Sequence, residues 1–458
     1  MIFLCRYGKI ISLKRGAAEH EYRAPRRWLR DLCTKRTQKG IAAEAQQDLG
    51  AALGVRENTR SPVTATVKRF FGRSYEEGEE GGHAFFFYKT HLLTKEFIMQ
   101  KQYKVGVIGA TGMVGQRFVT LLDGHPLFRP VALAASARSA GKSYEEAVGS
   151  RWAMSVPMPS YAKDMILLDA ESDAEKLASL VDFVFCAVNM KKEEIKALEE
   201  KYAKLEVPVV SNNSAHRATP DVPMIIPEIN DDHLSVIAAQ RRRLGTKRGF
   251  IAVKSNCSLQ SYVPLLHPLM KFGIKCAAVT TYQAISGAGK TFETMPEIVD
   301  NIIPYIGGEE QKSEEEPLKI WGSVKGDKIV NAKGPVITSQ CLRVPVSDGH
   351  TAAVFVSFER KPSKEEILSA WKEFSGAPQA LSLPSAPKQF IHYFEEDNRP
   401  QAKLDRMTEN GMAACAGRLR EDVLFDYKFI GLSHNTLRGA AGGAVLLAEL
   451  LAAKGYFD

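Results

Sequence analysis

Cys257 is the residue of this chain whose surroundings most favour covalent chemistry. It stands within residues 253–260, where a short β-like run stops and an apolar stretch with helical spacing begins. At the first turn of a helix, unpaired backbone N–H groups and the helix dipole favour the thiolate, which is the nucleophilic form of cysteine. The alternative is a packing residue, because free cysteine is often buried as a small hydrophobe. Further motifs in the chain bear on this choice.

A glycine-rich turn upstream has the form of a dinucleotide-binding turn. Residues 109–115 read Gly-Ala-Thr-Gly-Met-Val-Gly and lie between a predicted strand and a predicted helix. Glycines there allow a tight turn and a close backbone approach, so that a pyrophosphate can rest on the helix N-terminus. The alternative is a purely structural turn. We expect cofactor contacts from Gly109, Thr111, Gly112, Met113, Val114 and Gly115.

The end of the second predicted strand bears on which cofactor is used. An acidic residue there would hydrogen-bond the ribose 2′-hydroxyl of NAD. This chain instead has Ser136, Arg138 and Ser139. An arginine and hydroxyl groups suit the 2′-phosphate of NADP, which we therefore predict over NAD. The alternative for Arg138 is a solvated loop charge.

Four more segments contain polar clusters that a core pattern does not require. They are residues 212–217, 283–289, 309–312 and 343–350. With the glycine turn and residues 255–258, in this order, they resemble the aspartate-β-semialdehyde dehydrogenase family. The likeness runs from about Lys104 to the C-terminus, and residues 349–358 look most like the archaeal and fungal type.

The resemblance implies a reaction. Such enzymes reduce β-aspartyl phosphate with NADPH to aspartate semialdehyde and phosphate, in the biosynthesis of threonine, methionine, lysine or isoleucine. Cys257 would attack the acyl carbon and expel phosphate, and the resulting thioester would accept hydride. His350, seven residues after Arg343, would be the general acid and base, with a pKa near the operating pH. Gln283 would orient the thioester carbonyl or the substrate. A structural histidine is the alternative for His350.

The resemblance also implies the substrate contacts. Arg343 would hold the α-carboxylate through a bidentate fork. The phosphate group would be bound by Arg217, Asn256 and Lys312, while Glu309 would face the substrate ammonium group. A solvated loop is the alternative for the acidic run that begins at Glu309.

Three residues are implied as further cofactor contacts. Ser286 and Gly287 would approach the cofactor through their backbone, and Asn435 would reach the nicotinamide carboxamide. No metal is expected.

The sequence departs from the family pattern beside the cysteine. Residues 258–260 are Ser-Leu-Gln where many relatives have Ser-Thr, so one hydroxyl group is missing. Two related reductases are alternatives. N-acetylglutamyl-phosphate reductases usually have Pro-Gly-Cys-Tyr at the nucleophile, which residues 256–258 do not match. Malonyl-CoA reductases share the scaffold and are less firmly excluded.

The chain outside these motifs indicates how they are positioned. From Lys104, strand-like runs at residues 104–108, 131–135, 182–186 and 207–211 alternate with helical stretches, which predicts a parallel sheet. We also expect a helix over 259–272, strands near 277–282, 340–346 and 352–359, and a last helix over 436–453.

The fold class predicted from this order is α/β, with two domains. A Rossmann-type NADP-binding domain spans residues 99–255 and 435–458, and an α+β catalytic and dimerisation domain with a mixed sheet spans 256–434. The resemblance implies a homodimer or homotetramer through the second sheet. Residues 1–98 are expected to be a poorly structured extension.

The charge of the chain is concentrated in this extension. The chain has a net charge of +8, and residues 1–98 hold 18 Lys and Arg against 11 Asp and Glu, which leaves +1 for the rest. A basic nucleic-acid-binding protein is the alternative from a different class, but it requires charge on a folded face. We expect no nucleic acid partner.

Neither a membrane span nor a disulfide framework is expected. The most apolar stretch, residues 439–453, is broken by Glu449. The seven cysteines are scattered and never in C-x-x-C spacing, which indicates a reducing compartment without a zinc site. We expect a cytoplasmic protein, or an organellar one if the extension is a targeting peptide.

Overall fold

The computed structural model describes residues 11–15, 18–22 and 101–458. The chain divides into two compact units, residues 1–94 and 95–458. In the first, β1 (Ile11–Arg15) and β2 (Ala18–Tyr22) pair as antiparallel strands. The prediction that residues 1–98 are poorly structured otherwise falls outside the described residues.

The second unit contains a seven-stranded sheet in which every neighbouring pair is parallel. The order is β5-β4-β3-β6-β7-β9-β8. The strands are β3 (Tyr103–Ile108), β4 (Phe128–Ala135), β5 (Leu168–Asp169), β6 (Phe183–Cys186), β7 (Val209–Ser211), β8 (Met224–Ile225) and β9 (Ile251–Lys254). Their residues are almost all buried, as expected for strands covered on both faces. The predicted parallel sheet is confirmed.

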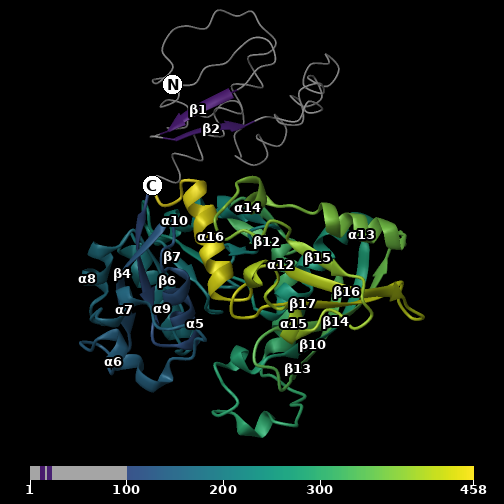
Figure 1. Ribbon diagram of the computed structural model, residues 1–458, viewed down its shortest axis with the longest axis horizontal. Coiled ribbons are helices and arrows are strands. Elements are labelled where there is room, and N and C mark those ends of the chain that lie inside the picture. The colour runs from purple at the N-terminus through teal and green to yellow at the C-terminus, as the bar shows by residue number, and fades with distance from the viewer. Residues whose placement is uncertain (1–10, 16–17, 23–100) are drawn as a thin grey trace, which may run out of the picture. The chain divides into compact units, whose positions relative to one another are not determined.

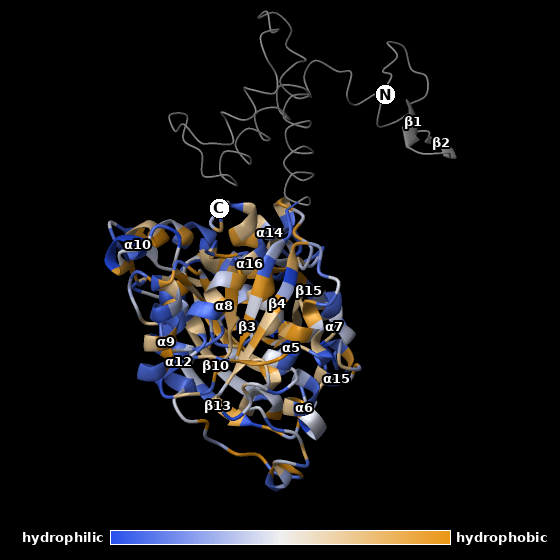
Figure 2. Ribbon diagram, turned by 90° about the vertical axis from the view of Figure 1, so that its left-hand side faces the viewer, coloured by the Kyte–Doolittle hydropathy of each residue, from blue (hydrophilic) through white to orange (hydrophobic). Residues whose placement is uncertain are grey.

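Helices pack against this parallel sheet. They are α5 (Met113–Leu121), α6 (Tyr144–Val148), α7 (Ser160–Lys163), α8 (Ala174–Leu180), α9 (Lys192–Lys204), α10 (Ile237–Leu244) and α16 (Ala441–Ala453). Although α16 is last in the sequence, it contacts α5, β7 and β9 and lies with this sheet in Figure 1. Figure 2 shows β3 and β4 in apolar colours and α9 and α10 in more polar ones. Helix α16 begins at Ala441, five residues later than expected.

A second, six-stranded sheet is mixed, as predicted. Its order is β13-β10-β14-β17-β16-β15. The strands are β10 (Ile274–Gln283), β13 (Val336–Arg343), β14 (His350–Phe358), β15 (Ile391–Phe394), β16 (Ala414–Glu421) and β17 (Tyr427–Ser433). The accompanying elements are α11 (Val263–Leu266), α12 (Glu309–Ile320), α13 (Lys364–Glu373), α14 (Ala377–Ala380), α15 (Ala402–Asp405) and the hairpin β11 (Ser323–Lys325) and β12 (Lys328–Val330).

The register of this sheet brings predicted site residues to one end. Strand β10 pairs in parallel with β13, and Gln283 lies opposite Arg343. The antiparallel pairing of β10 with β14 sets Tyr282 opposite Thr351, so β14 begins at His350 at the same end. Strand β13 ends at Arg343 rather than at residue 346, because Pro345 has no N–H to donate to a ladder.

The segment after Cys257 is a broken helix rather than the single helix expected over 259–272. A 3-10 turn (Ser258–Ser261), α11 and a second 3-10 segment (His267–Phe272) follow one another. Pro264 and Pro268 lie in the first turns of the last two pieces, where a missing N–H is tolerated but an unbroken α-helical ladder is not possible.

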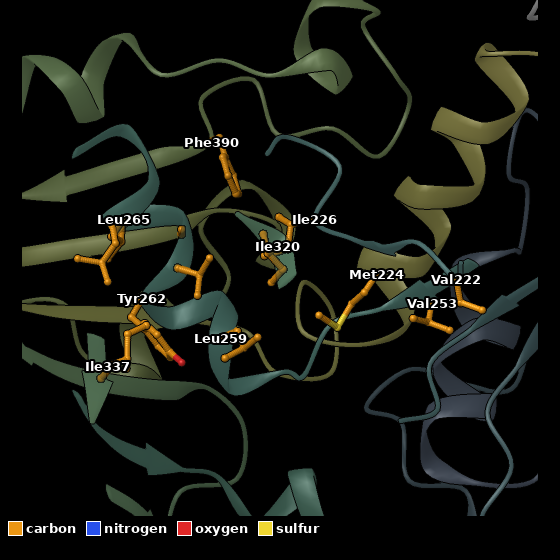
Figure 3. Packing of buried hydrophobic residues seen from close by; sticks show 14 of the residues in the cluster. Val222, Met224, Ile226, Val253, Leu259, Tyr262, Leu265, Ile320, Ile337 and Phe390 are labelled. Atoms are coloured by element: carbon orange, nitrogen blue, oxygen red, sulfur yellow. The ribbon is translucent and has the colours of Figure 1, made fainter. Parts of the chain in front are cut away.

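This broken helix fills the core between the two sheets. Leu259 and Tyr262 belong to one buried apolar cluster with Val253 of the parallel sheet and Ile337 of the mixed sheet. Figure 3 shows these side chains among residues from both sheets. Because the core is continuous there, the segment that carries Cys257 is held by both sheets.

Candidate active site

Cys257 and His350 face each other where the two sheets meet. Cys257 follows β9 and caps the 3-10 turn Ser258–Ser261, and His350 is the first residue of β14. The Cys257 Sγ lies 3.3 Å from His350 Nε2, although 93 residues separate them in the chain. Cys257 is half-buried and His350 is fully buried. The structure thus brings the predicted nucleophile and the predicted acid–base residue into contact.

The backbone determines which nitrogen of His350 carries the proton. The Ala284 N–H donates to His350 Nδ1 at 3.0 Å. A backbone amide keeps its proton, so Nδ1 is an acceptor and the neutral ring carries its hydrogen on Nε2, facing the sulfur. Burial, together with the charges of Arg343, His434 and Lys254, holds the pKa of His350 well below its usual value. This differs from the expected pKa near the operating pH, because the ring is dry.

The pKa of the Cys257 thiol is also displaced. Burial raises it, and the Glu309 carboxylate acts in the same direction, while Lys254, Arg217 and Arg343 act against them. The expected lowering by a helix N-terminus is not seen. The turn after Cys257 has only four 3-10 residues, so it contributes little dipole, and desolvation dominates.

Glu309 is the centre of a polar cluster beside the thiol. Its carboxylate accepts hydrogen bonds from Asn256 Nδ2 (2.9 and 3.1 Å), Lys312 Nζ (2.7 Å) and Gln283 Nε2 (3.4 Å). Burial alone would raise the pKa of Glu309, but the Lys312 ammonium and the amide donors outweigh it and lower the pKa. The structure therefore gathers four of the predicted residues into one group.

The acidic run 309–316 is helix α12 and not a solvated loop. Glu309 and Glu316 are two turns apart on one side of this helix, and both are buried. Glu316 accepts from the backbone N–H of Asn256 at 2.7 Å and from Arg217 Nη1 at 3.0 Å. Glu316 therefore anchors the segment that leads to Cys257. It was not among the predicted residues, although a spacing of seven from Glu309 is the spacing of two residues on one side of a helix.

Arg217 is held against the same segment. Its Nε donates to the Lys254 carbonyl at 2.9 Å and its Nη2 to the Asn212 carbonyl at 3.2 Å, in addition to the Glu316 contact. A guanidinium group has five N–H donors, so one hydrogen remains on each terminal nitrogen. Arg217 is thus a fixed cation near Asn256.

Arg343 lies close to His350 across Gly287. Arg343 is 7% exposed, and its Nη1 donates to the Ala284 carbonyl at 2.7 Å. A Cβ atom on Gly287 would lie 3.0 Å from this Nη1 and 3.1 Å from the His350 ring. Asn435 connects the same region to the C-terminal segment: it accepts from the Gly349 N–H and donates to Ser286 Oγ, both at 2.8 Å.

The glycine turn has the shape that a bound phosphate group needs. Gly109 has a φ of +85°, and a Cβ atom there would lie 2.4 Å from the Ala187 carbonyl. A Cβ on Gly115 would lie 2.1 Å from the Gly109 carbonyl. Gly112 caps α5 and is exposed, with Thr111, Met113 and Val114 half-buried around it. The first turn of α5 therefore presents open backbone amides.

The predicted ribose-phosphate segment lies at the same edge of the sheet. Strands β3 and β4 are parallel with Ile108 opposite Ala134, and the N–H groups of Gly109 and Ala110 donate to the Ala134 carbonyl. The turn after β4 therefore follows directly beside the glycine turn, and it exposes Ser136 and Arg138 while Ser139 is half-buried.

Comparison with known proteins connects this geometry to a family. Residues 104–237 match the semialdehyde dehydrogenase NAD binding domain and residues 266–438 match the semialdehyde dehydrogenase dimerisation domain. The chain is 44% identical over 353 residues to the aspartate-semialdehyde dehydrogenase of Archaeoglobus fulgidus, covering 76% of this chain and 98% of that protein. The chain belongs to the aspartate-semialdehyde dehydrogenase family.

Other members of the family agree. The Saccharomyces cerevisiae aspartate-semialdehyde dehydrogenase is 42% identical over 363 residues, covering 76% of this chain and 97% of that protein. The crystal structure of the Candida albicans enzyme with NADP superposes with a TM-score of 0.70 at 38% identity, covering 78% of this chain and all of that one. The predicted family, fold class, oxidoreductase activity and dinucleotide cofactor are confirmed.

A buried hydrogen-bond network next to the segment that carries Cys257 was not predicted from the sequence. The Arg438 guanidinium forms a two-pronged pair with Glu228, and its Nε donates to Gln260 Oε1 at 2.9 Å. Gln260 Nε2 in turn donates to Ser255 Oγ at 2.9 Å. Gln260 thus links the C-terminal segment to the turn before Cys257.

Proposed function

We propose that the chain catalyses the NADPH-dependent reductive dephosphorylation of L-4-aspartyl phosphate to L-aspartate 4-semialdehyde, in the biosynthesis of threonine, methionine, lysine or isoleucine. The observation that carries this proposal is the 3.3 Å contact between Cys257 Sγ and His350 Nε2, beside a group of cations and a carboxylate. Members of the family named above carry the same activity in their names.

Cys257 is the proposed nucleophile. Its thiolate forms a bond to the acyl carbon of the substrate while the bond to phosphate breaks, which leaves a thioester on Sγ. Bound NADPH supplies the hydride that reduces this thioester. Collapse of the tetrahedral product breaks the carbon–sulfur bond, releases the aldehyde and regenerates the thiolate.

The resemblance predicted His350 as a general acid and base; because burial holds its pKa well below the usual value, we propose that it serves this reaction as a hydrogen-bond donor. Its neutral ring presents Nε2–H to the sulfur, which stabilises the thiolate before attack. The same N–H is placed to donate to the substrate oxygen that gains negative charge next to the sulfur. Gln283, at the end of β10, is the proposed second contact that orients the carbonyl group or the substrate.

The charged residues around the thiol divide between the two ends of the substrate. Arg343 is the proposed partner of the α-carboxylate, and Glu309 of the ammonium group. Arg217, Asn256 and Lys312 are the proposed phosphate contacts. Because Lys312 pairs with Glu309 in the structure, an arriving ammonium group and a phosphate group would each replace one half of this ion pair.

The cofactor is proposed to be NADP. Gly109, Thr111, Gly112, Met113, Val114 and Gly115 would hold the pyrophosphate, and Ser136, Arg138 and Ser139 the 2′-phosphate. Ser286, Gly287 and Asn435 would lie along the nicotinamide end. The crowding around Gly109 and Gly115 and the exposure of Gly112 fit such a group, and the Candida albicans relative was solved with NADP.

We also propose the organisation of the chain. Residues 99–255 with 435–458 form the cofactor domain and 256–434 the catalytic domain, which joins copies into a homodimer or homotetramer. One face of the mixed sheet supports this, since alternate residues of β14 such as Thr351, Ala353 and Phe355 are only half-buried in the single chain.

A cytoplasmic location is consistent with the free thiols of Cys186 and Cys341. In residues 101–458, no helix has the length and apolar content required to cross a membrane.

The test is the reverse reaction. Wild-type protein should oxidise aspartate semialdehyde only when both phosphate and NADP are present, and Cys257→Ala should be inactive while it binds NADP with near wild-type affinity. An active Cys257→Ala variant would contradict the proposal. Reduction of malonyl-CoA at a comparable rate would favour the related reductase instead.

A further inference from the structure

Lys254 is a buried lysine three residues before Cys257. It is the last residue of β9 and only 2% exposed. Its Nζ donates to the carbonyl oxygen of Ser255 at 2.7 Å, so the side chain folds forward over the turn that leads to Cys257. Among residues 101–458, no carboxylate lies within 4.0 Å of this amine. Buried lysines are normally paired with an acid, so this position requires another explanation.

Helix α16 leaves room for this side chain. A Cβ atom on Gly443 would lie 3.2 Å from Lys254 Cε, so the glycine lets the helix pack closely over the lysine stem. The charged and titratable groups that influence the amine come from every surrounding element. They are Cys257 itself, Arg217 after β7, Arg438 before α16 and Glu316 of α12. His350 of β14 also interacts with the amine, whose positive charge acts to lower the pKa of the imidazole.

The Cys257 thiolate needs a positive charge that His350 does not supply. The Ala284 N–H occupies His350 Nδ1, so the ring cannot take up the thiol proton and become an imidazolium without losing that contact. The Arg217 guanidinium is already bound by the Glu316 carboxylate and by the backbone carbonyls of Lys254 and Asn212. Among residues 101–458, Lys254 and Arg343 are the cations near Cys257 that have no carboxylate partner, and Arg343 is the one proposed to bind the substrate carboxylate.

We propose that Lys254 is a positioning residue for the proposed nucleophile, and that its buried ammonium group stabilises the thiolate of Cys257. This inference rests on the proposed role of Cys257. The interaction is strong because both groups lie in a region of low dielectric, where opposite charges attract more than they do in water. In this role the lysine acts on the sulfur through its charge.

The titration of the two groups is consistent with this arrangement. Burial lowers the pKa of Lys254 to about 7, and the negative charge of Cys257 acts to raise it again. Lys254 in return lowers the pKa of the thiol. The amine and the sulfur therefore titrate as a pair, and the form that has lost one proton includes the reactive thiolate–ammonium species.

The test measures ionisation of the thiol directly. The rate of Cys257 alkylation by iodoacetamide is followed from pH 5.5 to 9.5 in the full-length protein, with Cys257→Ala as the background for the other thiols. Only the thiolate reacts, so the midpoint of the rate profile reports its pKa. In Lys254→Met we expect the midpoint to rise by about one unit, with alkylation at pH 7 slowed roughly tenfold.

Controls separate this effect from packing. Lys319 is a second buried lysine, whose Nζ donates to the carbonyls of Arg217, Thr219 and Val222, and Lys319→Met should leave the midpoint unchanged. If Lys254→Met fails to fold, Lys254→Gln removes the charge and retains a donor for Ser255. An unchanged midpoint in the folded Lys254 variant, or an equal rise in Lys319→Met, overturns the inference. Failure of the proposed role of Cys257 has a different signature. Wild-type protein alkylated at Cys257 would then still oxidise aspartate semialdehyde.

Discussion

The glycine turn and the thiol centre are the two halves of the proposed site, and they are built in opposite ways. The turn is one continuous segment, residues 109–115, and the tightest contact of Gly115 is with Gly109 and Ala110 in the same segment. The thiol centre joins Cys257 to a histidine 93 residues away and to Glu309 on a third segment. Sterics within the segment fix Gly115, and a further contact between Gly109 and Ala187 after β6 completes the turn, whereas the thiol centre depends on the register of a sheet.

The two halves also differ in how charge is handled. The turn leaves Gly112 exposed, so its amides can meet an anion without first burying a charge. The thiol centre is dry, and burial displaces the pKa values of Cys257, His350 and Lys254 in the direction of the neutral forms. The thiol centre therefore has to supply its own counter-charges, and the turn does not.

Removing the long-range contact should have the largest effect. In His350→Asn we expect turnover to fall roughly 10²- to 10⁴-fold, because the N–H donor at the sulfur is misplaced, while the KM for the semialdehyde changes little. Steady-state kinetics with saturating phosphate and NADP measures this. A raised KM with normal turnover would assign His350 to substrate binding.

The neutral state of His350 adds a signature to this prediction. Since the pKa of the ring lies well below its usual value, wild-type turnover should not lose activity through histidine protonation between pH 6 and 7. A decline over that interval that is absent in His350→Asn would show that the ring titrates and that the thiol centre is wetter than the structure indicates.

Disrupting the glycine turn should reduce activity less, and it should do so by destabilising the fold rather than by removing a catalytic group. Gly115→Ala forces a Cβ to within 2.1 Å of the Gly109 carbonyl, so we expect a loss of roughly 1–3 kcal/mol in the free energy of unfolding together with weaker NADP binding. Urea unfolding and cofactor titration measure the two quantities. Gly112→Ala is the matched control for stability, because its nearest neighbour would be 3.6 Å away. Equal destabilisation of both variants would show that sterics within the turn are not the cause.

The smallest effect is expected at the exposed end of the cofactor site. Arg138→Ser should reduce the preference for NADP over NAD roughly tenfold, since one charge-assisted contact to the 2′-phosphate is lost in solvent. The ratio of kcat/KM for the two cofactors measures it, and thermal unfolding should be unchanged. An unaltered ratio would mean that Arg138 is a solvated loop charge and that Ser136 and Ser139 alone bind the 2′-phosphate.

The features that could be predicted were the local ones. Alternating apolar runs indicated both sheets, and the spacing of glycines indicated the turn before α5. The break in the helix after Cys257 was also predictable, because Pro264 and Pro268 exclude an unbroken ladder although the apolar period of residues 259–272 is helical. The acidic run at Glu309 was ambiguous since charge alone does not distinguish a loop from a helix with two buried carboxylates.

The residue types and the order of the strands and helices that carry them can be read from the chain alone, because short-range sterics and hydrophobic periodicity act within a few residues. The sequence contained the thiol, the glycine turn and the cations. The folded arrangement is needed to see that the Ala284 N–H sets the tautomer of His350 and that Lys254 is buried three residues before Cys257. Those states depend on desolvation and on charges brought close from distant segments, and neither is encoded at any single position of the chain.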